Sequence, residues 1–255
     1  MPIILNALVL LASGLGAGLL GSCLGVGGGV ILVPILTIIT GSPHQAIGTS
    51  LAAIIGVHGS ATLFHLREAW VDMKIAFLLG SSMVLGAIIG AIAAGFVPGK
   101  ALGIMFAGVA LYVATTMFLP ARRKPETQSD MLTGPKRKPL GVLLGGFVGM
   151  ISGMLGIGGG IMNVPVMHLV MGVPTKRAIA TSSFLIGTAA GPGAIIYLAR
   201  GDVLIQTIPP VVIGIIIGAL AGAWIARRAR PRWLRAAFGI LLLYTAAQML
   251  WKILT

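Results

Sequence analysis

Long apolar segments without Asp, Glu, Lys or Arg in their interiors constrain this chain more than any other feature. Ten such segments are separated by short polar links: 3–24, 29–40, 46–65, 75–96, 101–119, 139–156, 160–172, 178–199, 205–226 and 236–253. A helix that crosses a bilayer needs about 20 apolar residues. Backbone polar groups in lipid must be satisfied by helices or by a closed barrel. Because the segments are long and lack the alternation of barrel strands, we expect an all-α integral membrane protein.

The composition excludes a soluble domain and a nucleic-acid-binding protein. Only 9% of the residues are charged and the mean hydropathy is +1.03, whereas about 25% of an ordinary soluble domain is charged. The net charge of +13 comes from basic residues in short links, where orientation signals are expected. They form no continuous basic surface. The first segment has no basic residue before it, so we interpret it as retained membrane structure and not as a cleaved signal peptide.

The sequence repeats itself once over nearly its whole length. GSCLGVGGGVILVPIL at 21–36 matches SGMLGIGGGIMNVPVM at 152–167, and AIGTS at 46–50 matches AIATS at 178–182. The prediction is a first transmembrane repeat, a cytoplasmic linker and a second transmembrane repeat: 1–119, 120–138 and 139–255.

The segment that follows each GxGGG cluster is too short to cross a membrane alone. Twelve helical residues cover about 18 Å of a hydrocarbon core of about 30 Å. We therefore expect a broken or re-entrant helix pair at each GxGGG, plus three transmembrane helices in each half. Each half then crosses an odd number of times, so the two repeats are inverted.

Loop charge favours this inverted arrangement over one in which each pair makes a single crossing. Fifteen of the 18 Lys and Arg residues then share one face, against Lys100, Arg200 and Lys252 on the other. The single-crossing arrangement splits them ten to eight. The positive-inside rule prefers the first, with basic loops in the cytoplasm and both termini outside.

Inverted repeats with broken helices are a transporter arrangement, with the binding site near the midplane. Glycine clusters let the backbone approach a ligand closely, and a helix that starts after one presents free N–H groups and a positive dipole end. Two such ends would hold an anion without a buried cation, although the glycines could serve tight helix packing alone. The candidate glycines are Gly25, Gly27, Gly28, Gly29, Gly156, Gly158, Gly159 and Gly160. Other glycines spaced by four, such as Gly14 and Gly18, are predicted to pack helices closely.

Several polar residues are further candidates for the binding site: Thr49, Ser50, Thr181, Ser182, Asn163, Cys23 and His58. The four hydroxyls begin the third segment of each half and could either donate to an anion or bond back to helix carbonyls. His58 is the candidate for proton coupling, with a bond to a neighbouring helix as the alternative. Cys23 could contact ligand or be a buried inert thiol. Helix breaks that line a cavity are predicted at 56–60 and 187–193, where glycines cluster.

The stretches LLGSCLGVGGGVILVP and ISGMLGIGGGIMNVP, followed by AIGTS and AIATS, resemble the TauE/SafE family of sulfite exporters. The resemblance covers both halves and implies a multi-pass permease of the prokaryotic inner membrane. The family includes exporters and importers of sulfite, sulfonates and other small organic anions, so direction and substrate do not follow from it. A cysteine just before the first motif, Cys23, departs from the usual family pattern.

The resulting prediction is a membrane transporter, not an enzyme, that exports sulfite or a related small sulfur-containing oxyanion. The alternatives are a proton-coupled importer of a small organic anion, which would use His58, and an anion channel. No cofactor or metal is expected, because no ligand cluster is present. The expected partners are the anion and the lipid bilayer, without nucleic acid, and the sequence leaves a homodimer open.

Overall fold

The computed structural model describes residues 2–24, 27–67, 71–118, 137–226 and 231–254, and the regular structure within them is helical. The helices are α1 (Pro2–Leu24), α2 (Gly29–Thr40), α3 (Pro43–Arg67), α4 (Met73–Ala94), α5 (Gly99–Phe118), α6 (Arg137–Leu155), α7 (Gly160–Pro165), α8 (Thr175–Ala199), α9 (Ile208–Ala226) and α10 (Pro231–Leu254). A π-helix, η1 (Val166–Val170), continues α7, and a 3-10 turn, η2 (Ile205–Thr207), precedes α9. Each of the ten apolar segments thus forms a helix, which confirms the all-α prediction.

Local chemistry sets several helix boundaries. The carboxylate of Asp72 caps α4 by accepting the backbone N–H groups of Lys74 (3.1 Å) and Ile75 (3.2 Å). α2 ends at Gly41, whose φ of 73° is the left-handed conformation that glycine adopts easily. α7 widens into η1 directly after Pro165, because proline has no N–H for the carbonyl four residues earlier.

The predicted breaks within the third segments are wrong. α3 and α8 are continuous helices through 56–60 and 187–193. Pro192 removes only one intrahelical hydrogen bond. The other backbone groups of an apolar helix have no water to bond instead, so the helix persists around the proline.

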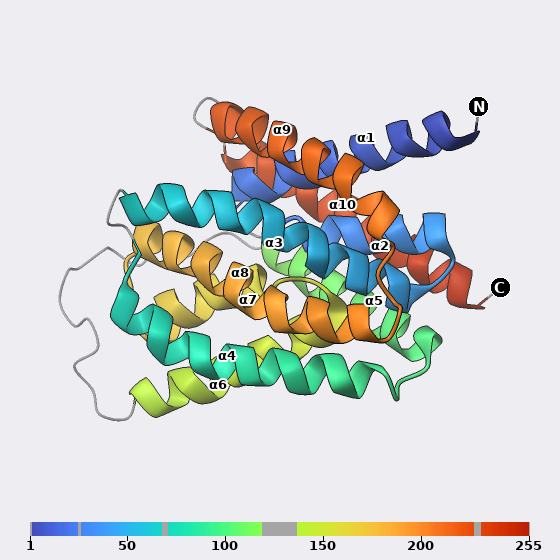
Figure 1. Cartoon of the computed structure of the whole chain (residues 1–255). Helices are drawn as coiled ribbons and strands as arrows, with labels where there is room; N and C mark the ends of the chain where they lie inside the picture. The colour runs from blue at the N-terminus through green and yellow to red at the C-terminus, as the bar shows by residue number, and fades with distance from the viewer. Residues whose placement is uncertain (1, 25–26, 68–70, 119–136, 227–230, 255) are drawn as a thin grey trace.

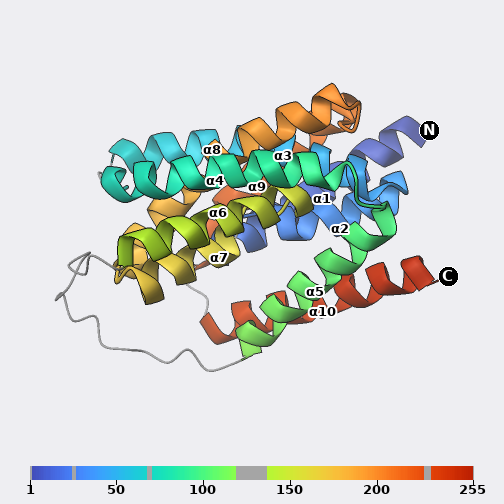
Figure 2. The same ribbon diagram turned by 90° about the horizontal axis from the view of Figure 1, so that it is seen from below.

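The helices pack in pairs that join the two halves of the chain. α1 lies along α9, α4 lies along α6, and α3 and α8 lie between these pairs (Figure 1). α5 and α10 form a further pair at one side of the bundle (Figure 2). The first helix of each half therefore packs on the fourth helix of the other half, and the third and fifth helices pack on their own counterparts.

Glycine stripes mediate the α1–α9 and α4–α6 contacts. A Cβ on Gly18 would collide with the carbonyl oxygen of Ile215, and one on Gly149 would collide with that of Met83. Gly218 faces the carbonyl of Leu15 in the same way. The prediction that glycines spaced by four pack helices closely is confirmed at these positions.

α2 and η1 do not continue across the bundle. α2 leads back to the end of the bundle at which α1 begins, and η1 leads back to the end at which α6 begins (Figure 1). Both reversals follow the glycine clusters, since α1 ends at Leu24 and α6 ends at Leu155.

The outer surface suits lipid. Three stretches within the described helices are long and apolar enough to cross a membrane: Met73–Ala94, Arg177–Ala199 and Ile205–Gly222. Large apolar side chains lie exposed on the outside, among them Phe77 (71%), Leu143 (70%) and Leu220 (71%). An aqueous surface rarely carries so much exposed apolar area.

Candidate functional site

The two glycine turns meet in the interior of the bundle. A Cβ on Gly29 would lie 2.5 Å from the carbonyl oxygen of Gly156 and 3.0 Å from the carbonyl carbon of Ile157. Gly27, Gly28 and Gly29 are buried, as are Gly156, Gly158, Gly159 and Gly160. The backbone of α2 at its first residue therefore contacts the turn that precedes α7, and a side chain at Gly29 would disrupt this contact. Gly25 lies outside the described residues.

Ser50 links α3 to the opposite half. Its hydroxyl donates to the carbonyl oxygen of Gly156 at 3.1 Å, and the residue is fully buried. The matching residue in α8 is Ser182, which is also fully buried. Its hydroxyl has no hydrogen-bond partner among the described residues.

Asn163 is the polar exception in the helix that follows the second glycine turn. The repeat aligns it with Leu32 of α2. Its side chain is 2% exposed, and its Nδ2 lies 3.5 Å from the position of a Cβ on Gly159. This amide nitrogen also lacks a partner within the described part of the chain. A buried donor without a partner costs about 1–3 kcal/mol, so this amide is a candidate for a bond to ligand.

Thr49 and Thr181 contact backbone loops and not the glycine turns. The hydroxyl oxygen of Thr49 accepts the N–H of Leu204 at 3.0 Å, and that of Thr181 accepts the N–H of Asp72 at 3.1 Å. They hold the loops before α9 and α4 at matching positions. From the sequence we expected these hydroxyls to bond either to ligand or to a carbonyl of the same helix. The sequence did not predict that they bond to the loops.

For two candidate binding residues, the structure describes the backbone but not the side chain. Cys23 lies in α1 and His58 lies in α3, but both side chains fall outside what the structure describes. Their expected contacts with ligand remain predictions.

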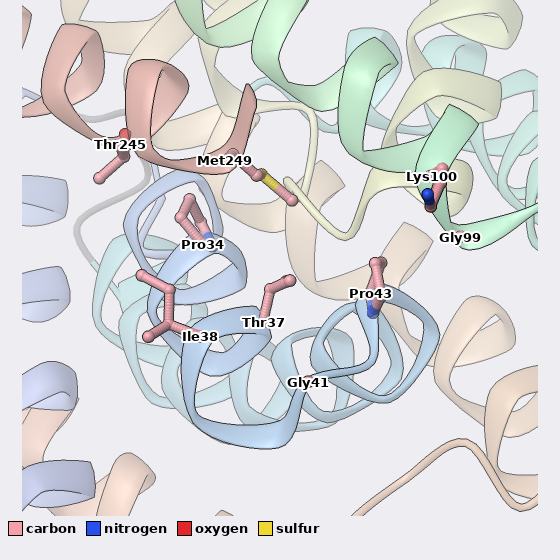
Figure 3. A pocket seen from close by; sticks show the side chains of 9 residues that line it. All are labelled: Pro34, Thr37, Ile38, Gly41, Pro43, Gly99, Lys100, Thr245 and Met249. Carbon is pink, nitrogen blue, oxygen red and sulfur yellow. The ribbon is translucent and has the colours of Figure 1, made fainter. Parts of the chain in front are cut away.

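A cavity of about 360 Å³ lies between α2, α5 and α10 (Figure 3), and sequence patterns did not predict it. Its lining consists of Pro34, Thr37, Ile38, Gly41, Pro43, Gly99, Lys100, Thr245 and Met249. Only the isolated basic residue Lys100, between two apolar segments, could have drawn attention to it. The packing of α10 on α2, which forms one side of the cavity, has no local sequence signal.

A second polar cluster lies where α8 ends. Arg200 donates to the carboxylate of Asp202 at 2.7 Å and to the carbonyl oxygen of Ala91 at 2.8 Å. Its guanidinium also lies 4.5 Å from the ring centre of Tyr197. His44 contacts the carbonyl oxygen of Ala94 at 3.1 Å. These contacts tie α3 and α8 to the last turn of α4, and they leave Arg200 engaged in structural bonds.

Comparisons with known proteins identify the family of this chain. A family model described as sulfite exporter TauE/SafE matches residues 10–249. The chain belongs to the TauE/SafE family. The probable membrane transporter protein YunE of Bacillus subtilis is 28% identical over 97% of this chain and 98% of its own. A probable membrane transporter protein of Methanocaldococcus jannaschii is 30% identical over 89% of each chain.

The match of this TauE/SafE chain to its relatives covers almost all of the described helices. YdhB of Bacillus subtilis, another probable membrane transporter protein, is 28% identical over 81% of this chain and 84% of its own. Among solved structures no match was found. Family membership and the apolar helices together support a membrane protein that performs transport.

Proposed function

We propose that this TauE/SafE protein exports sulfite or a related small sulfur-containing oxyanion, which binds between the two glycine turns. The observation that carries this proposal is the pair of buried donors without described partners, the amide of Asn163 and the hydroxyl of Ser182. Both belong to segments that follow the glycine turn of the second half.

The chemistry of these atoms favours an anion as ligand. The atom of Asn163 without a partner is the nitrogen, which can only donate. A ligand that pairs with it must therefore accept hydrogen bonds, as oxyanion oxygens do. The first N–H groups of α2 and the positive end of its dipole lie at the same contact between the turns. This site requires no Lys or Arg from the described residues. An anion would therefore bind to N–H groups and to the helix dipole, without the strong attraction of a buried opposite charge that would slow its release.

The contacts between the halves support the inverted repeats of 1–119 and 139–255. Gly18 on Ile215 and Gly149 on Met83 are equivalent contacts with the halves exchanged. Lys74 and Arg177 line one surface hollow at one end of the bundle. We accordingly propose that this end faces the cytoplasm of a prokaryotic cell.

Membrane potential gives the proposed direction. An interior-negative potential of 100 mV is worth about 2.3 kcal/mol per charge. A dianion that leaves the cell gains about twice that, or roughly three decades of concentration ratio. Of the five acids in the chain, the described ones, Asp72 and Asp202, lie outside the helices. Export therefore requires no intramembrane carboxylate to carry a proton.

The test is sulfite and thiosulfate flux into proteoliposomes, with membrane potential and pH gradient set separately. Asn163→Leu should fold, because Leu32 occupies the matching position. The lost hydrogen bond to a charged ligand, about 1.5–3 kcal/mol, should raise the apparent KM about 10- to 150-fold. Ser13→Ala is the control, since its buried hydroxyl bonds Leu10 within its own helix. It should leave the KM unchanged.

Saturable flux driven by potential alone, and weakened by Asn163→Leu, supports the proposal. Absence of flux of both anions contradicts it. Flux that strictly requires a pH gradient and His58 points instead to a proton-coupled carrier of another anion.

A further inference from the structure

The cavity between α2, α5 and α10 combines apolar walls with one charge. Pro34 and Ile38 of α2 and Met249 of α10 form the walls, and Lys100 of α5 lies at the rim (Figure 3). The threonine hydroxyls in the lining bond to their own helices, as Thr245 does to the carbonyl of Leu242 at 3.0 Å. Lys100 is therefore the lining side chain that can attract a ligand by charge.

The size of the cavity and the presence of a lysine indicate that it holds water. A cavity needs about 10–15 Å³ of probe volume for one water molecule, and this one offers about 360 Å³. A lysine is costly in hydrocarbon and faces a water-filled cavity or the interface instead. Lipid tails alone would leave Lys100 without solvation.

The electrostatic potential in the cavity is positive. The first residues of α3 and α5 meet there, since a Cβ on Gly99 would lie 3.4 Å from Cδ of Pro43. Each helix N-terminus contributes roughly +0.5 charge and the C-terminus of α2 roughly −0.5, which with Lys100 gives about +1.5. No acidic residue belongs to the described lining. A lysine in the first turn of a helix is repelled by the positive end of the helix dipole. A negative ligand would offset both the charge of Lys100 and the positive end of the α5 dipole.

Helix α2 extends from the first glycine turn to the cavity. Pro34, in its inner wall, follows Gly29 by five residues, or about 7.5 Å along the helix axis. The cavity is also lined by Gly41 and Pro43, at the junction of α2 and α3. This junction lies at the end of the bundle where α1 begins (Figure 1).

We propose that this cavity is an aqueous vestibule that concentrates a small hydrated anion on the side of the membrane where the two termini lie, with Lys100 as its attracting charge. The proposal rests on the proposed function only in taking the transported anion as the occupant. The aqueous, anion-attracting character of the vestibule stands on the cavity itself.

Thiol labelling tests the vestibule without measuring transport. Single cysteines are introduced by Ile38→Cys or Ile39→Cys in a Cys23→Ser chain, which then holds no other thiol. The two isoleucines are adjacent and similarly exposed, at 42% and 39%, but only Ile38 lines the cavity. Membrane-impermeant methanethiosulfonates, one anionic and one cationic, are added from each side of the vesicle in turn.

The Ile38→Cys thiol should react from the side of the termini at least about tenfold faster than the Ile39→Cys thiol, because thiolates form in water and not in lipid. Adding Lys100→Gln should lower the ratio of anionic to cationic labelling rates severalfold, because the loss of one positive charge slows the anionic reagent and speeds the cationic one. Lys74→Gln is the matched control, since Lys74 is likewise the second residue of a long helix but lies at the other end of the bundle. It should leave the ratio unchanged.

Equal labelling of the two cysteines, or a rate ratio that Lys100→Gln does not change, overturns the proposal. A vestibule confirmed by labelling in a protein that moves neither sulfite nor thiosulfate would contradict the proposed function alone. Where flux is measurable, Met249→Trp should reduce it severalfold by filling the cavity, whereas the neighbouring Leu250→Trp should not. Equal flux in the two variants would show that the anion does not pass through the cavity.

Discussion

Ser50 and Ser182 occupy matching positions in α3 and α8, yet their hydroxyls have different surroundings. Ser50 donates to the carbonyl oxygen of Gly156, so its hydroxyl holds one glycine turn in place. Ser182 is equally buried, and its hydroxyl has no described partner. We therefore propose that the same residue type serves structure in one half and binds ligand in the other.

Alanine substitutions should separate these roles. Ser50→Ala leaves the buried oxygen of Gly156 without its donor, so unfolding free energy should fall by about 1–3 kcal/mol. Ser182→Ala removes a buried hydroxyl that bonds nothing described, so stability should be unchanged or higher while anion flux falls. Thermal unfolding in detergent and proteoliposome flux measure the two effects. Equal destabilisation by both variants would show that Ser182 has a structural partner.

The sequence identified Ser50, Ser182 and Asn163 as candidates for the binding site, but it did not predict what these side chains bond. Asn163 is recognisable in the sequence because it is polar and stands where the first repeat has the apolar residue Leu32. The bonds of Thr49 to Leu204 and of Thr181 to Asp72 join residues more than 100 positions apart. No local pattern encodes such a contact, since it depends on how the halves dock.

The positions of the helices, unlike these hydrogen bonds, could be predicted from the sequence. Their positions follow from hydropathy, because a long apolar segment in lipid has no alternative to a helix. The same rule explains why α8 stays continuous across Pro192 although glycine and proline favour breaks in soluble proteins. Glycine stripes mediate the α1–α9 and α4–α6 pairs. The stripes are visible in the sequence, but the sequence does not indicate which helix each stripe faces.

Glycines within one helix should therefore differ in their tolerance of a methyl group. Gly18→Ala places a Cβ against the carbonyl of Ile215 on α9 and should destabilise the protein by about 1–3 kcal/mol. Gly16→Ala is the control in the same helix, because nothing lies within 4 Å of its Cβ position. It should be neutral or stabilising by up to about 1 kcal/mol, through helix propensity. Denaturant titration in detergent measures both, and equal effects would contradict the packing interpretation.

For the whole molecule, the two ends of the bundle carry different charges. Lys74 and Arg177 lie at one end, and Lys100 and Arg200 lie at the other. Fifteen of the 18 basic residues fall on the Lys74 face in the inverted arrangement. Under the proposed inverted arrangement, the positive-inside rule predicts that the Lys74 end faces the cytoplasm.

Sided labelling of two cysteines tests this orientation. In a Cys23→Ser chain, Lys74→Cys should react with an impermeant thiol reagent only from the cytoplasmic side, and Lys100→Cys only from the opposite side. Both lysines are exposed at helix starts, so reagent access should be similar. Labelling of both from the same side would contradict the inverted repeats.

The pairing of α1 with α9 bears on how the protein is made. During synthesis α1 emerges roughly 200 residues before the helix that covers its glycine stripe. At 5–20 residues per second, α1 waits about 10–40 s in the bilayer with that stripe facing lipid or a membrane chaperone. α4 waits for α6 for a much shorter time. Neither half contains the partner of its own first helix, so the nascent first half is an incomplete structure that the second half finishes, and a ribosome that stalls in the linker would release a chain that cannot complete its packing.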